Sequence, residues 1–178
     1  MQAIKDKLKI VRVSSHKLYV GEFLEGRCEG RSIVVCKNGN AYEGMMRENR
    51  REGRGAYVQA GMGYFEGVFA NDLKAQTGVE VVYGKWAYRG GFLNGLRHDG
   101  GVLVEKEIAY VGQWKLGIMH GKGTLRTNAS TFQGTLVNSL KHGAGEERFT
   151  NGDVYRGDYQ NNRFDGFGSY TWRGGASY

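Results

Sequence analysis

Large apolar side chains alternate with glycine in short stretches that recur along the whole chain. Each stretch begins with an aromatic residue, has a small residue two positions later, and has a second large side chain two positions after that. The first aromatic residues are Tyr19, Tyr42, Phe65, Tyr88, Tyr110, Phe132 and Tyr155. A period of two is typical of a β-strand, because alternate side chains of a strand point to the same face. The pattern therefore predicts one strand starting near each of these residues.

The stretches are spaced by 23, 23, 23, 22, 22 and 23 residues, so the chain is a tandem array. If the first aromatic residue of each repeat is position 0, position 7 is always a residue that favours turns. These residues are Gly26, Asn49, Asp72, Gly95, Gly117, Ser139 and Asn162. A second β-rich stretch, such as GVEVVY (78–83), follows each turn. Each repeat is therefore expected to form one β-hairpin.

The expected domain organisation follows from this register. Residues 19–178 form the array, with repeats starting at 19, 42, 65, 88, 110, 132 and 155, and Tyr178 stands at the first position of an eighth repeat. Residues 7–18 are interpreted as an N-terminal half-repeat, and residues 1–6 as a frayed end. Hairpins stacked in sequence pair edge to edge, because a single hairpin is marginally stable. The predicted fold is all-β: one elongated, twisted antiparallel sheet that forms an open solenoid-like rod.

Composition supports a folded, non-secreted chain. The 30 glycines accompany 11 Tyr, 8 Phe and 3 Trp, and disordered chains are poor in aromatic residues. No apolar run reaches the roughly 20 residues of a membrane-spanning helix, and the N-terminus lacks a signal-peptide core. Cys28 and Cys36 are expected to be free thiols in a reducing compartment. The net charge of +7 fits either plain solubility or an acidic partner.

No residue pattern indicates catalysis, a cofactor or a metal. His98, His120 and His142 recur with the repeat, and adjacent repeats would place their rings about 10 Å apart, too far to share one ion. They are interpreted as residues that support turns. Neither a nucleophile elbow, nor a P-loop, nor a dinucleotide-binding motif occurs. The chain is therefore not expected to be an enzyme.

The repeats resemble the MORN family, whose units read Y-x-G-x-W, a turn, and then G-x-G. The clearest copy is YVGQWKLGIMHGKGTLRTNAST (110–131). Departures are Met46 in place of an aromatic residue, and Gln76 and Asp99 in place of the first glycine of G-x-G. The resemblance implies a non-catalytic scaffold for protein–protein interactions, a subunit of a eukaryotic cytoskeletal or ciliary assembly. It also implies a cytoplasmic, cytoskeletal or ciliary location and binding to other proteins of a complex, or to a second copy through a terminal repeat edge.

Two candidate binding sites follow. The first is a groove for a partner protein, lined by aromatic residues that also serve the core: Tyr88, Phe92, Tyr110, Trp114, Tyr155 and Tyr159. The second is a basic patch around the hairpin turn of the second repeat, formed by Arg47, Arg50, Arg51 and Arg54. This patch either keeps sheet edges apart or serves an alternative function, recruitment to anionic phospholipid. Nucleic acid is not an expected partner, and a regulatory fragment of a larger enzyme is a minor alternative.

Overall fold

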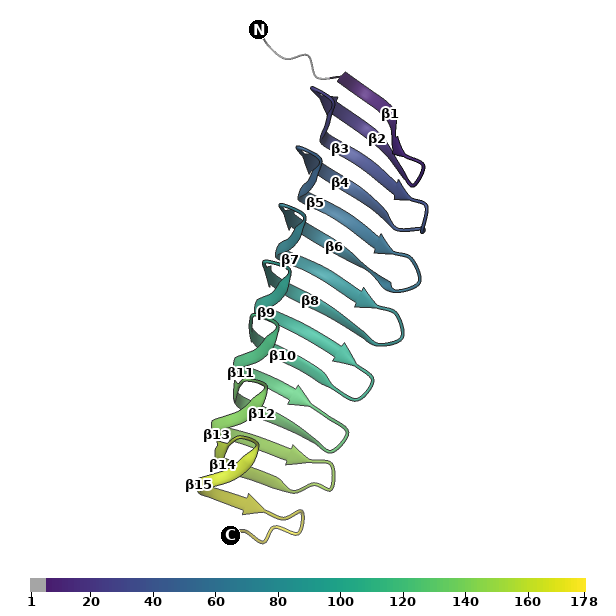
Figure 1. Ribbon diagram of the computed structural model, residues 1–178. Coiled ribbons are helices and arrows are strands. Elements are labelled where there is room, and N and C mark those ends of the chain that lie inside the picture. Colours follow the sequence, from purple (N-terminus) through teal and green to yellow (C-terminus); the bar gives the residue numbers. More distant parts are fainter. Residues whose placement is uncertain (1–5) are drawn as a thin grey trace. The chain divides into compact units, whose positions relative to one another are not determined.

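The computed structural model describes residues 6–178, and every element in that part of the chain is a β-strand (Figure 1). In chain order the strands are β1 (Asp6–Ser14), β2 (Lys17–Leu24), β3 (Arg27–Cys36), β4 (Ala41–Arg47), β5 (Arg50–Gln59), β6 (Gly63–Ala70), β7 (Leu73–Val82), β8 (Trp86–Leu93), β9 (Leu96–Glu105), β10 (Ala109–Lys115), β11 (Ile118–Arg126), β12 (Ser130–Val137), β13 (Leu140–Phe149), β14 (Val154–Gln160) and β15 (Arg163–Thr171). Of the end predicted to fray, residues 1–5 lie outside the described residues, and Asp6 begins β1.

The fifteen strands form one open antiparallel sheet in which the spatial order equals the sequence order. Each repeat contributes two strands, so β2 and β3 form the first repeat and β14 and β15 the seventh. The predicted all-β fold of consecutive hairpins is confirmed. β1, which covers most of the expected half-repeat, pairs with β2.

The chain divides into two compact units. In the described residues, unit 1 comprises 6–87 with 92–95, and unit 2 comprises 88–91 with 96–178. Each unit buries a row of large side chains on one face of its strands. In unit 1 the row includes Tyr19, Phe23, Tyr42, Met46, Phe65, Phe69 and Phe92. In unit 2 it includes Tyr88, Tyr110, Trp114, Phe132, Leu136, Tyr155 and Tyr159.

In the second to seventh repeats, the glycines let the position-0 ring lie flat along its own hairpin. Gly44 and Gly55 are direct partners of β4 and β5, and the Tyr42 ring covers both. A Cβ atom on Gly55 would lie 2.4 Å from the Tyr42 hydroxyl oxygen, so no larger residue fits there. The ring ends in a hydrogen bond, because the Tyr42 hydroxyl donates to the carbonyl of Met45 at 2.7 Å. In the large–small–large pattern, the first large residue is therefore the ring, and the glycine provides the space beneath it.

Each repeat has a left-handed backbone at two sites, the hairpin turn and position 11. In each hairpin turn both central residues have positive φ, for example Asn71 at 47° and Asp72 at 68°. This is the type I′ geometry that matches the twist of paired strands. The second left-handed site is position 11 on the following strand, where Gly53 has φ 75° and Gln76 has φ 52°. The strand pairing shifts register near this residue, which marks a β-bulge.

Candidate functional site

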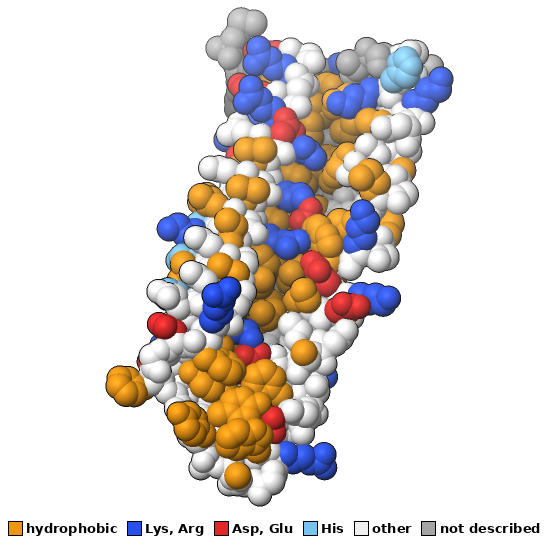
Figure 2. Space-filling model, turned by 60° about the horizontal axis from the view of Figure 1, so that its bottom comes forward, with side chains coloured by type: hydrophobic (Ala, Val, Ile, Leu, Met, Phe, Trp, Pro, Cys, Tyr) orange, Lys and Arg blue, Asp and Glu red, His pale blue; other side chains and the backbone are white. Residues whose placement is uncertain are grey.

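The face of the sheet that carries the buried rings is called the inner face below, and the opposite face the outer face. On one hollowed face, Figure 2 shows hydrophobic side chains with lysine and arginine side chains between them. This pattern arises because position 9 of several repeats is a cation that lies directly over the rings. The cations are Arg51 and Lys74 in unit 1, and Arg97 and Lys141 in unit 2.

Each cation contacts the position-0 ring of its own repeat and the position-4 ring of the next. The distances from cation to ring centre are 6.0 and 4.9 Å for Arg51 over Tyr42 and Phe69, 5.4 and 5.9 Å for Lys74 over Phe65 and Phe92, 5.0 and 5.2 Å for Arg97 over Tyr88 and Trp114, and 5.3 and 5.6 Å for Lys141 over Phe132 and Tyr159. A cation within about 6 Å of a ring face is attracted by the ring quadrupole. The same arrangement therefore recurs in four repeats.

Carboxylates also pair with Arg51, Lys74 and Lys141. The Arg51 guanidinium donates to the Asp72 carboxylate at 3.1 Å and to the Asp72 backbone carbonyl at 2.8 Å. Lys74 pairs with Glu80, and Lys141 pairs with Glu147. In the two lysine pairs, the acid lies six residues after the base on the same strand.

Glu147 shows how the inner face holds a carboxylate. Its side chain is 5% exposed and accepts hydrogen bonds from Lys141 and Ser130 and, at 2.9 Å, from the Tyr159 hydroxyl. Burial acts to raise the pKa of Glu147, but these donors more than offset it and hold the pKa below its usual value. A buried carboxylate is thus kept ionised by one ammonium group and two hydroxyls.

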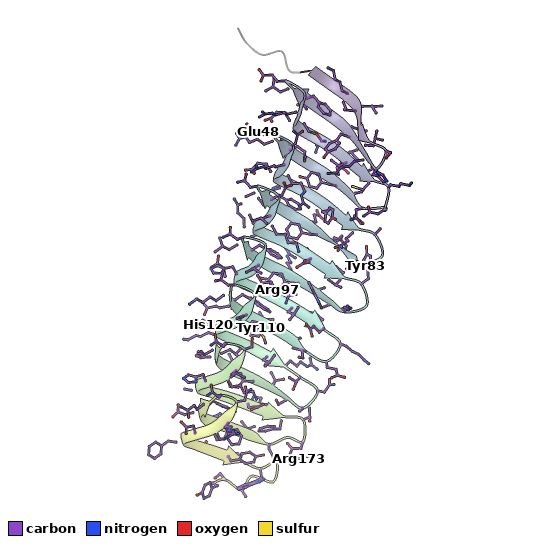
Figure 3. All side chains as sticks on the ribbon, in the orientation of Figure 1. Glu48, Tyr83, Arg97, Tyr110, His120 and Arg173 are labelled. Carbon is purple, nitrogen blue, oxygen red and sulfur yellow. The ribbon has the colours of Figure 1, made fainter. Side chains whose placement is uncertain are left out.

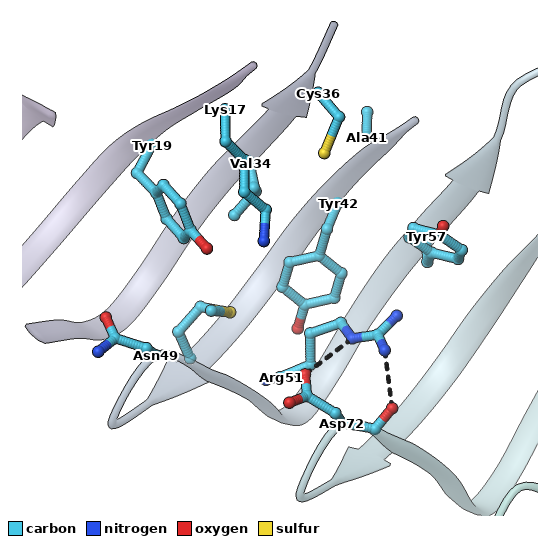
Figure 4. A pocket seen from close by; sticks show the side chains of 11 residues that line it. Lys17, Tyr19, Val34, Cys36, Ala41, Tyr42, Asn49, Arg51, Tyr57 and Asp72 are labelled. Carbon is cyan, nitrogen blue, oxygen red and sulfur yellow. Dashed lines mark hydrogen bonds and ion pairs between the residues drawn. The ribbon is translucent and has the colours of Figure 1, made fainter. Parts of the chain in front are cut away.

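Unit 1 contains a hollow on the inner face, shown in Figure 4, with a volume of about 450 Å³. Tyr19, Tyr42 and Tyr57 supply aromatic walls, and Lys17 and Arg51 supply positive charge. The remaining lining residues are Val34, Cys36, Ala41, Met46, Asn49 and Asp72. The volume lies within the range of small-ligand sites.

The hollow exists because the first repeat has small side chains where other repeats have large ones. Position 9 is Cys28, in the place of Arg51 in the second repeat, and position 15 is Val34, in the place of Tyr57. In other repeats, the position-9 cation covers the position-0 ring of its own repeat and the position-4 ring of the next. Here these two positions are Tyr19 and Met46, and both line the hollow. The period-two pattern does not show this difference, which appears only when the repeats are aligned position by position.

The aromatic residues predicted to line a partner groove are core residues. In unit 1, Phe92 is 4% exposed, and in unit 2 the exposed fractions are 1% for Tyr88, 0% for Tyr110, 5% for Trp114, 6% for Tyr155 and 2% for Tyr159. Figure 3 shows Tyr110 and Arg97 among the inner-face side chains of unit 2. A partner on this face would first meet the cations above the rings. The partner-binding role of these aromatic residues stays a prediction.

The predicted arginine patch is divided between the two faces of the sheet. Arg51 is half-buried on the inner face, where it pairs across the strands with Met46 and binds Asp72. Arg47 and Arg50 are opposite each other and exposed on the outer face, and Arg54 is also exposed. The structure thus brings Arg47 and Arg50 together but separates Arg51 from them, because adjacent residues of a strand point to opposite faces.

The three recurring histidines occupy the outer face. The His98 Nδ1 atom accepts a hydrogen bond from the Leu116 amide at 3.3 Å, next to the hairpin turn, and His142 is exposed opposite Thr135. His120 lies beside the turn edge of unit 2 in Figure 3. Among residues 6–178, no group of three His, Cys, Asp or Glu side chains could hold a metal ion.

The described chain also contains no helix long and apolar enough to cross a membrane. A comparison with protein-family models finds the MORN repeat at residues 19–41, 42–60, 88–98, 110–128, 132–154 and 155–177. These segments cover more than half of the chain, so the protein belongs to the MORN-repeat family. MORN repeats are commonly modules that interact with proteins or membrane lipids, and their fold is known as a non-catalytic one.

Six of the seven expected repeats are matched, and the third repeat is not, although its strands β6 and β7 pair like the others. This repeat carries Gln76 at position 11 in place of glycine. A comparison with curated proteins found no match to the chain.

Proposed function

We propose that the protein is a non-catalytic scaffold that binds partner proteins through the inner face of its sheet. The observation that carries this proposal is the hollow of unit 1, where aromatic walls and two cations surround space that the chain's own side chains leave open. Elsewhere on this face, the corresponding space is filled by large side chains at positions 9 and 15. A surface with apolar walls and a few placed polar groups is typical of binding sites.

More specifically, the protein would be a subunit of a eukaryotic cytoskeletal or ciliary assembly, located in the cytoplasm, the cytoskeleton or a cilium. The family resemblance supports this form. A second copy is a further candidate partner, through a terminal repeat edge. Support comes from β15, where Phe164 is 49% exposed and Phe167 is 93% exposed. Exposed apolar side chains on a strand favour contact with another chain.

The second candidate function is recruitment to anionic phospholipid. The observation that favours it is the exposure of Arg47, Arg50 and Arg54, together with the net charge of +7. Exposed charges are screened beyond about 8 Å at physiological ionic strength. Binding to lipid through these arginines would therefore weaken strongly as salt rises, whereas a protein segment held by aromatic contacts would stay bound.

The test is a pull-down from the source cells at graded salt, with three baits and mass spectrometry. The baits are the wild-type chain, the triple variant Arg47→Glu/Arg50→Glu/Arg54→Glu, and Val34→Tyr. The last places in the hollow the side chain that the second repeat carries at the same position. We expect a small set of proteins that survives high salt, remains with the triple variant and is lost with Val34→Tyr.

Liposome sedimentation provides the opposing arm. If the wild-type chain retains no protein at high salt, but binds phosphatidylserine vesicles in a way that the triple variant abolishes, the scaffold proposal is wrong. The lipid function would then replace it. Circular dichroism of each bait shows whether a loss of binding comes from loss of the fold.

A further inference from the structure

The chain itself shows which chemical group its inner face accepts above the rings. In the third repeat Lys74 holds Glu80, and in the sixth repeat Lys141 holds Glu147. Both carboxylates arise from position 15, and both are largely buried, with side chains 18% and 5% exposed. In two repeats, therefore, the lysine ammonium over an aromatic ring pairs with a carboxylate from position 15.

The hollow beside the first repeat has an ammonium group but lacks the carboxylate. Position 15 is Val34, and the cation is Lys17, which reaches in from β2 and lies 5.3 Å from the centre of the Tyr19 ring. Among residues 6–178, Lys17 makes no ion pair. Its pKa is raised, chiefly by the adjacent Tyr19 side chain and also by Cys36 and Asp72, while partial burial opposes the shift. The amine therefore stays charged at neutral pH.

The charged side chains that line the hollow sum to a net charge of one positive unit. Arg51 and Asp72 neutralise each other through a direct ion pair, so Lys17 is the remaining charge of the lining. The other titratable groups that face the hollow are Cys36 and the phenols of Tyr19, Tyr42 and Tyr57. The phenol of Tyr42 is neutral, because burial raises its pKa to about 12. A single negative charge is therefore the complement of this site.

From this geometry we infer that the hollow binds the carboxylate side chain of a glutamate or aspartate on an extended segment of a partner protein. The inference rests on the proposed function of the inner face and names the group that anchors the partner. The carboxylate would pair with Lys17 in the way that Glu80 pairs with Lys74. The aliphatic part of the side chain would lie against Val34 and Met46.

A phosphoinositide headgroup fits the hollow less well. Recognition of polyanionic headgroups typically uses clusters of about 4–8 basic residues. Here the lining contains two cations, and one of them is already bound to Asp72. The Asp72 carboxylate would repel a second or third negative charge.

Cys36 offers a direct probe of this charge preference. It is the cross-strand partner of Lys17 and lines the hollow, whereas Cys28 is 0% exposed. Iodoacetate and iodoacetamide both alkylate a thiolate with loss of iodide, and they differ in carrying a carboxylate or a neutral amide. The ratio of the two rates at Cys36 cancels the reactivity of the thiolate itself. It therefore reports how well the hollow accepts a carboxylate.

For the native chain, we expect the iodoacetate-to-iodoacetamide rate ratio at Cys36 to exceed that of N-acetylcysteine amide by about three- to tenfold. Lys17→Met should return the ratio to that of the reference thiol. Lys85→Met removes an exposed lysine of unit 1 outside the hollow and should leave the ratio unchanged. Peptide mapping by mass spectrometry assigns the modified cysteine. A native ratio equal to the reference, or one insensitive to Lys17→Met, overturns the inference.

The occupant is tested with a library of random 12-residue peptides displayed on phage and selected on the whole chain. We expect enriched peptides to share one acidic residue and to lose binding to Lys17→Met and to Val34→Glu, which supplies an internal carboxylate. Enriched peptides without an acidic residue overturn the inference, as does Lys17-dependent binding of phosphatidylserine vesicles without any peptide. If proteins are retained at high salt but the alkylation ratio is not raised, the carboxylate anchor alone is wrong. If the ratio is raised but no peptide or protein binds, the proposed function and the peptide occupant are wrong.

Discussion

Position 11 of each repeat explains why one glycine recurs along the chain and why two repeats can lack it. The backbone there is left-handed in every repeat, including Gln76 with φ 52° and Asp99 with φ 58°. A left-handed conformation costs a residue with a Cβ atom roughly 1–2 kcal/mol, and glycine avoids that cost. The third and fourth repeats therefore carry local strain that the others lack.

Gln76→Gly should stabilise the protein. The relief of left-handed strain is offset in part by the greater freedom of glycine in the unfolded chain, roughly 0.5–1 kcal/mol. We expect a net gain of about 0.5–1 kcal/mol in the free energy of unfolding, measured by guanidinium denaturation. The matched control is Gly53→Ala at the same position of the second repeat, which by the same balance should lose about 0.5–1 kcal/mol. Destabilisation by Gln76→Gly would show that its side chain contributes more than the strain costs.

The roles of the rings and glycines were easier to predict than the face on which each charged side chain lies. The rings and the glycines followed from period-two alternation and repeat spacing, because both depend on local geometry. The arginine patch was harder to predict. Arg50 and Arg51 are neighbours in sequence, yet one is exposed and the other covers the Tyr42 ring. Which of two adjacent charges faces the rings depends on strand register, and a β-bulge shifts that register within the hairpin.

At the scale of the hairpin, the turn residue at position 7 also joins each repeat to the one before it. The Asp72 amide donates to the Arg51 carbonyl at 3.0 Å, and the Asp72 carboxylate accepts from the Arg51 amide at 2.9 Å. Asn162 makes the same two bonds with Lys141, at 3.1 and 2.8 Å. Asn and Asp at this position therefore tolerate positive φ and also bond to the preceding repeat. The sequence predicts only their role in the turn.

The Lys74–Glu80 pair on β7 should be replaceable as a pair but not singly. The fifth repeat has Met119 and Leu125 at the same positions. We expect Glu80→Leu alone to cost about 1–3 kcal/mol, because Lys74 would keep its charge on a half-buried face without its carboxylate. The double variant Lys74→Met/Glu80→Leu should be within about 1 kcal/mol of the native chain.

A double-mutant cycle by chemical denaturation measures the difference, with Lys74→Met as the fourth corner. The same cycle on exposed Arg27 and Glu48, whose charged atoms are 3.7 Å apart, is the control and should give a coupling below about 1 kcal/mol. Equal costs for the single and double variants at Lys74 and Glu80 would mean that the pair does not act as a unit.

At the scale of the whole molecule, the buried tyrosines predict the response of both units to alkali. Burial raises the pKa of Tyr42 in unit 1 and of Tyr88 in unit 2 to about 12, although Arg51 and Arg97 oppose the shift. In the unfolded chain a tyrosine ionises near pH 10. The protonated phenols therefore stabilise the folded state fully below pH 10, and this contribution is lost as the pH rises towards 12.

We expect the free energy of unfolding to fall steadily between pH 10 and 12, and Tyr42→Phe to make this fall less steep. Denaturation at stepped pH measures the stability, and absorbance at 295 nm follows phenol ionisation. Tyr83→Phe, at a tyrosine that is 51% exposed, is the control and should leave the slope unchanged. A stability that stays constant up to pH 12 would contradict the burial of these phenols as the controlling factor.

The sheet could be predicted from sequence because a repeated hairpin has few ways to stack. The hollow could not be predicted from the period alone, because it depends on the exceptions to the period. The first repeat has the small residues Cys28 and Val34 at positions 9 and 15. Val34 lines the hollow, and the charge comes from Lys17, which precedes the first repeat. A search for regular positions passes over such residues, and only the differences between repeats identify the site.

The position-9 cations above the rings bear on how the binding specificity proposed for the inner face could change. Position 9 is Cys28, Arg51, Lys74, Arg97, Met119, Lys141 and Phe164 in successive repeats, while the ring and glycines beneath it stay nearly the same. The ring and glycines that maintain each hairpin are thus separate from the position that varies. If the inner face binds a partner as proposed, substitution at position 9 would change the charge or size that one repeat presents and leave its hairpin intact. Specificity could then be altered one repeat at a time.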